Sequence, residues 1–63
     1  MTLGERILNY RARYNISQED FANRAKVNVM TINSIENGKR KPTRLTMSKI
    51  EIVLREDENH VED

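Results

Sequence analysis

A segment near the middle of the chain, residues 28–38, carries residue types that suit contact with nucleic-acid bases. At about 100° per residue, Ile32 and Ile35 define the buried side of a helix. The opposite half has no Lys or Arg and carries Met30, Asn33, Ser34 and Asn37, with Val29 at its edge. An asparagine can pair with adenine, a serine can donate or accept, and an apolar side chain can contact a thymine methyl group. A lone exposed methionine is also ordinary on a protein surface, so the face alone leaves both interpretations open.

Basic residues lie beside this helix rather than on its outward face. Lys39, Arg40 and Lys41 follow it directly, and Arg44 opens the next helix. Before it, Gln18 and the free backbone amides of the preceding helix offer a second set of groups for phosphates. Phosphate contacts position a protein on DNA and base contacts specify the sequence, so this division favours DNA binding.

Composition narrows the class of protein. A chain of 63 residues suits one domain. It has no cysteine and a single histidine, His60, in a charged segment, so we expect no disulfide and no metal site. Short apolar runs and the absence of a signal region predict a soluble, cytoplasmic protein without a membrane segment. Neither a catalytic constellation nor a glycine-rich phosphate loop is visible, which argues against an enzyme, a cofactor or a small-molecule ligand.

Charge is unevenly distributed along the chain. Residues 1–54 hold ten of the eleven Lys and Arg but five of the ten Asp and Glu, about +5, whereas residues 55–63 carry about −4. We expect residues 1–54 to form the domain and residues 55–63 to form an acidic, flexible tail. That tail could simply aid solubility, or it could compete with phosphates for the basic flank.

Apolar periodicity predicts an all-α fold of four, or five, short helices. The first spans residues 3–14 and ends at Asn15, and the second spans residues 18–25 behind the N-cap Ser17. Asn28 caps the third, which stops at residues 37–38, and Thr43 caps a fourth that reaches about residue 54. The second and third helices, joined by a tight turn, form a helix-turn-helix.

The stretch "ISQEDFANRAKVNVMTINSIENGKRKP" resembles the helix-turn-helix of the Cro and lambda-repressor-like regulators, the XRE family, and the likeness extends over residues 3–54. The resemblance implies a repressor that binds double-stranded operator DNA as a homodimer. It also implies a buried pair between Arg11 and Glu36, although an exposed position for Arg11 is equally compatible with the pattern. By position, Asn28, Val29, Met30 and Ser34 match base-contacting residues, and Gln18, Asn37 and the backbone around Lys39, Arg40 and Lys41 match phosphate-contacting ones.

Three features depart from this family. Lys26 stands in the turn where glycine is common; a left-handed backbone there would cost roughly 1–2 kcal/mol, so we expect a slightly different turn. Val29 and Met30 replace residues that are often polar, which shifts base reading toward methyl contacts and DNA shape. The segment "REDENHVED" takes the place of the family's usual fifth helix and dimerisation region.

Two apolar stripes are predicted on the fourth helix. Met47, Ile50, Val53 and Leu54 cluster on a core-facing sector, whereas Leu45 and Ile52 lie on another. The second stripe could join two copies of the chain or close the core where the fifth helix is missing, and we favour the second alternative. The sequence therefore predicts a DNA-binding transcriptional regulator of the Cro or phage-repressor type. An antitoxin-like protein-interaction module that also binds DNA is the alternative.

Overall fold

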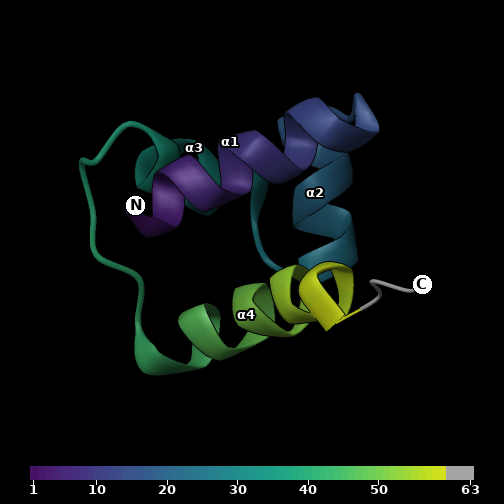
Figure 1. Cartoon of the computed structure of the whole chain (residues 1–63). Helices are drawn as coiled ribbons and strands as arrows, with labels where there is room; N and C mark the ends of the chain where they lie inside the picture. Colours follow the sequence, from purple (N-terminus) through teal and green to yellow (C-terminus); the bar gives the residue numbers. More distant parts are fainter. Residues whose placement is uncertain (60–63) are drawn as a thin grey trace.

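The computed structural model describes residues 1–59, which contain four helices joined by turns and loops. They are α1 (Leu3–Tyr14), α2 (Gln18–Ala25), α3 (Val29–Glu36) and α4 (Arg44–Asn59). In Figure 1, α1 and α4 lie on opposite sides of the molecule, α2 lies between them, and a long loop joins α3 to α4. The predicted all-α fold is confirmed, and α1 and α2 have the predicted bounds. None of the described helices is long and apolar enough to cross a membrane.

Each helix begins at a residue whose side chain accepts a backbone N–H. The Ser17 hydroxyl accepts from the amide of Asp20 at 3.0 Å, and the Asn28 Oδ1 accepts from the amide of Met30 at 2.7 Å. The Thr43 hydroxyl accepts from the amide of Thr46 at 3.2 Å. These bonds satisfy amides that have no partner within the helix. The three predicted caps are therefore confirmed.

Three helices are followed, within two residues, by a residue with a left-handed backbone. These residues are Asn15 (φ 54°), Lys26 (φ 60°) and Gly38 (φ 69°). After α3, the amide of Gly38 donates to the Ile35 carbonyl and that of Lys39 to the Ser34 carbonyl, the paired bonds of a Schellman motif. Lys26 and Val27 repeat the pattern after α2, where their amides donate to Asn23 and Ala22. Lys26 therefore adopts the left-handed backbone despite its steric cost. The expected change in the turn does not occur.

We expect Lys26→Gly to raise the free energy of unfolding by about 1 kcal/mol. Glycine removes the left-handed penalty of roughly 1–2 kcal/mol, and the greater freedom of the unfolded chain offsets part of that gain. Urea denaturation followed by circular dichroism measures the change. Lys26→Ala, which keeps the Cβ atom, is the matched control and should stay within about 0.5 kcal/mol of the parent. Equal stabilities for the glycine and alanine variants would contradict the strain.

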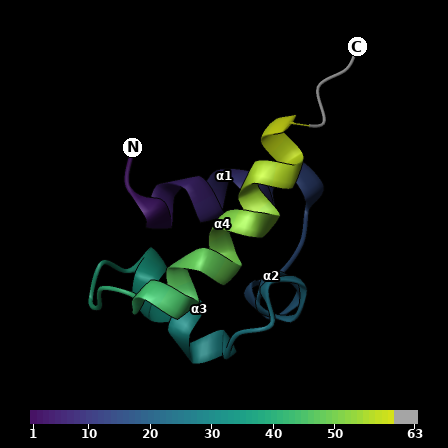
Figure 2. The ribbon, with the colours of Figure 1, turned by 90° about the horizontal axis from the view of Figure 1, so that it is seen from below.

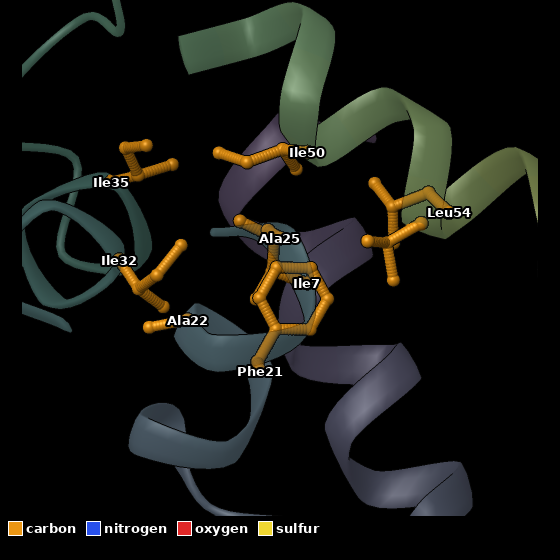
Figure 3. Close-up of a cluster of buried hydrophobic side chains, with 9 residues drawn as sticks. Ile7, Phe21, Ala22, Ala25, Ile32, Ile35, Ile50 and Leu54 are labelled. Atoms are coloured by element: carbon orange, nitrogen blue, oxygen red, sulfur yellow. The ribbon is translucent and has the colours of Figure 1, made fainter. Parts of the chain in front are cut away.

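The core lies where the four helices meet, and Figure 3 shows their side chains converging on Phe21. Phe21, Ile7, Ile32 and Ile50 are fully buried, one from each helix. Burying a side chain of this size contributes about 1.5–3 kcal/mol. The remaining buried hydrophobic residues of this core are Ala22, Ala25, Ile35, Val53 and Leu54. The predicted inner face of α2 and the two predicted anchors of α3 are confirmed.

Close backbone approach between α1 and α3 depends on Gly4. A Cβ atom at this position would lie 2.6 Å from the Ile35 carbonyl oxygen and 3.1 Å from the Glu36 Cα. Both neighbours are backbone atoms, so neither can move aside cheaply. Gly4 therefore lets the first turn of α1 rest directly on the last turn of α3, a role that the sequence pattern did not indicate.

An ion pair joins α1 to α4. Arg6 donates to both carboxylate oxygens of Glu51, at 2.8 and 3.1 Å. This hydrogen bonding, together with the charges of Arg6 and Arg55, lowers the pKa of Glu51 against a smaller opposing effect of burial. Because the folded-state pKa is lowered, the pair stabilises the fold above the carboxyl's ordinary pKa. That contribution is lost as the pH falls through the lowered value.

The structure corrects three expectations for α4. The helix continues to Asn59, beyond the predicted end near residue 54, because residues 55–59 include no Gly or Pro to stop it. Leu45 and Ile52 are 66% and 57% exposed, so they do not close the core, and the alternative we favoured is wrong. Met47, placed with the core, is 41% exposed. Residues 60–63, with His60, lie outside the described part, and the flexible tail stays a prediction.

Candidate functional site

The candidate site is built on α2 and α3, which are joined by residues 26–28. Figure 2 shows α2 nearly end-on with α3 beside it, while α1 and α4 extend across the view. The α3 helix has only eight residues, too few for a helix that is stable alone. Ile32 and Ile35 hold it against the core, so its opposite face is left outside.

The outward face of α3 is exposed as the helical pattern predicts. Met30 is 73% exposed and Val29 is 36% exposed. Asn28 and Asn33 are also exposed, and Ser34 is half-buried. The separation of this face from Ile32 and Ile35 is confirmed, whereas contact between these five outward residues and DNA bases stays a prediction.

The predicted phosphate-binding residues lie in different surroundings. Asn37 is the C-cap residue that follows α3, and Lys39, Arg40 and Lys41 are exposed in the loop after it. Arg44 is exposed at the start of α4, on the surface that also holds Met47, Ile52 and Arg55. The structure therefore places Lys39, Arg40 and Lys41 next to α3 and places Arg44 on the face of α4.

An ion pair fixes the C-terminal end of α3. The Arg11 Nη1 lies 2.8 Å from each carboxylate oxygen of Glu36, and the Arg11 Nε donates to the Ile16 carbonyl at 3.2 Å. The Glu36 side chain is 5% exposed and that of Arg11 is 22% exposed. Of the two arrangements that the sequence allowed, the buried pair is the correct one.

A chain of amide hydrogen bonds continues from this pair to the outward face of α3. The Gln18 Nε2 donates to Glu36 at 2.7 Å, and the Gln18 Oε1 accepts from the Asn33 Nδ2 at 3.3 Å. The Asn33 Oδ1 in turn accepts from the Asn37 Nδ2 at 3.2 Å. Sequence reasoning missed this chain. Only its last bond follows a local rule, because Asn33 and Asn37 are four residues apart on one helix.

A cluster of aromatic rings with one arginine lies at the C-terminal end of α1. Tyr10 stacks at a tilt on Tyr14, with ring centroids 4.8 Å apart, and meets the Phe21 ring edge-on at 5.3 Å. Arg24 lies 5.9 Å from the Tyr10 ring centre and donates to its hydroxyl at 2.9 Å. These contacts join α1 to α2. Among the described residues, no three His, Cys, Asp or Glu side chains are grouped so that they could hold a metal ion.

We expect Glu36→Gln to lower the free energy of unfolding by about 2–3 kcal/mol. The substitution leaves the half-buried charge of Arg11 without its counter-charge, which costs more than the pair itself contributes. Glu51→Gln removes the carboxylate of the more exposed Arg6 pair and should cost about 1 kcal/mol or less. Thermal and urea denaturation measure both values. Equal losses in the two variants would contradict the special position of Glu36.

Comparison with known proteins adds one finding. The family model HTH_3, described as "Helix-turn-helix", matches residues 7–60, a range that begins within α1 and includes α2, α3 and α4. No curated protein and no solved structure matched the chain.

Proposed function

We propose that this chain, which belongs to the helix-turn-helix family of XRE-type DNA-binding domains, is a sequence-specific transcriptional repressor of the Cro or phage-repressor type. The observation that carries this proposal is the neutral, exposed face of α3 directly beside the loop that carries Lys39, Arg40 and Lys41. An α-helix fits the major groove of B-DNA, where each base pair presents a distinct pattern of donors, acceptors and methyl groups. We place α3 in that groove.

The proposed base contacts come from the first two turns of α3 and its cap. Met30 and Val29 form an apolar leading edge that would meet thymine methyl groups. Asn28, Asn33 and Ser34 supply hydrogen-bonding groups beside them. The proposed phosphate contacts are Asn37, Lys39, Arg40, Lys41 and Arg44, with the first-turn amides of α2 on the other side of the groove.

Selection of bound DNA from a random pool tests this function directly. A regulator of this kind enriches one sequence, and a dimer enriches two inverted copies of it about one DNA turn apart. Binding that depends on the length of the DNA and on salt concentration but selects no sequence would overturn the proposal. Such behaviour would leave only a general affinity for polyanions.

Arg40→Ala and Met30→Ala should change binding in different ways. Loss of Arg40 should weaken binding to all sequences and reduce the slope of log affinity against log salt by about one unit, because one phosphate contact is lost. Loss of Met30 should instead weaken the preference at one or two base pairs and leave the salt slope unchanged. Titrations of labelled duplexes at several salt concentrations measure both effects. An unchanged selected site for Met30→Ala would contradict the assignment of its side chain.

We further propose that the protein binds DNA as a homodimer through α4. Leu45 and Ile52 are two turns apart on the same exposed stripe, and neither contributes to the core. Paired copies would cover this stripe. In the described part of the chain, α4 thus offers an exposed apolar surface that is available for pairing.

Ile52→Glu should shift the protein toward monomer and weaken binding to a two-half-site operator, because it places a charge in the proposed contact. Leu8→Glu is the matched control, since Leu8 is 44% exposed on α1, away from that stripe. Sedimentation with and without operator DNA measures the state, and circular dichroism confirms helicity. A monomer before and after the change, even on DNA, would exclude this interface.

A further inference from the structure

We propose that Gln18 is a positioning residue that fixes the orientation of the Asn33 amide for reading adenine. This inference rests on the proposed DNA-binding function. Gln18 was predicted to contact phosphate, but its side chain lies between the buried carboxylate of Glu36 and the exposed amide of Asn33. Both ends of the Gln18 amide are therefore engaged within the protein.

The order of donors and acceptors along this series of hydrogen bonds is set at its start, by the ion pair between Arg11 and Glu36. The Arg11 guanidinium can only donate, and the Glu36 carboxylate paired with it can only accept. The Gln18 amide must therefore turn its nitrogen toward Glu36, at 2.7 Å, and its oxygen toward α3. An amide flipped the other way would place its oxygen against a carboxylate, which is unfavourable. One buried ion pair thus sets the orientation of Gln18.

The same logic passes from Gln18 to the outward face. Because the Gln18 oxygen accepts, Asn33 must present its nitrogen to it, at 3.3 Å. The Asn33 oxygen is then directed to the Asn37 nitrogen, at 3.2 Å. An asparagine amide has two N–H groups and two acceptor lone pairs, so one of each remains for a base. Asn33 therefore offers one donor and one acceptor in a fixed order.

A donor next to an acceptor matches adenine, which presents the N7 acceptor beside the N6 donor in the major groove. Guanine presents two acceptors there and would leave the Asn33 oxygen facing another oxygen. An Asn33 side chain without Gln18 would have to lose its own rotational freedom on binding. DNA also excludes water from this surface, which strengthens hydrogen bonds that are solvated in the free protein. Gln18 thus acts through Asn33 on one base pair.

A phosphate contact by Gln18 predicts a different result, so the two roles can be separated. Removing a neutral phosphate contact weakens binding to every sequence alike, because the backbone is the same for all. Removing a positioning residue changes the preference at one base pair and depends on the presence of Asn33. The discriminating measurement is therefore base preference at each position of the selected site.

The experiment uses the full chain and duplexes in which each base pair of the selected site is changed in turn. The parent should prefer adenine at one pair by roughly tenfold or more. Gln18→Met and Asn33→Ala should each reduce that preference to about threefold or less, with preferences elsewhere retained. The double variant should lose no more than Asn33→Ala alone, because the two residues act as one unit. Asn23→Met, an exposed amide on α2, is the matched control and should leave every preference unchanged.

Three outcomes would overturn the inference. Gln18→Met could weaken all duplexes equally, which assigns Gln18 to a phosphate. It could lower affinity additively with Asn33→Ala, which separates the two residues. It could also leave the adenine preference intact. Denaturation of each variant identifies any that unfold, and Gln18→Ala then replaces Gln18→Met. If the parent protein selects no sequence, the proposed DNA-binding function is overturned as well. If the parent selects a site and the Gln18 variants select the same site with the same preferences, only the positioning role is overturned.

Discussion

The pairing of Arg11 with Glu36 is the constraint on which the rest of the molecule depends. Glu36 is the last residue of α3, and its carboxylate receives bonds from α1 and α2. An eight-residue helix gains little from its own hydrogen bonds, so its position is determined by the burial of Ile32 and Ile35 and by what holds its two ends. Asn28 caps one end, whereas the buried ion pair and the Gly38 motif hold the other. The exposed face of α3 can therefore carry residues that contribute nothing to folding.

Local chemistry explains why much of the fold could be predicted from the sequence. Ser17, Asn28 and Thr43 mark helix starts through bonds to residues two or three positions away, and apolar spacing indicates which sides of α2 and α3 are buried. The end of α4 was misplaced because apolar residues stop before the helix does. Charged residues with adequate helix propensity continue it to Asn59.

Contacts between distant residues explain what the sequence could not indicate. The need for Gly4 arises only when α1 crosses the last turn of α3, and no local pattern contains that crossing. Gln18 and Glu36 are likewise brought together by the packing of α2 on α3. The exposed face of α3 was predictable because it needs only helical periodicity. The hydrogen bonds that orient Asn33 required the tertiary structure.

The amide chain that runs from Glu36 to Asn37 also bears on how such a protein could diverge after gene duplication. Met30 is largely exposed, makes no core contact, and could be exchanged one substitution at a time as a binding site drifts. Asn33 differs, because its neighbours dictate which atoms it must present to them. A new residue there is best accommodated when Gln18 or Asn37 changes with it. Under the proposed role of α3, the base pair read by Met30 could therefore change alone, whereas the base pair read by Asn33 would change together with Gln18 or Asn37.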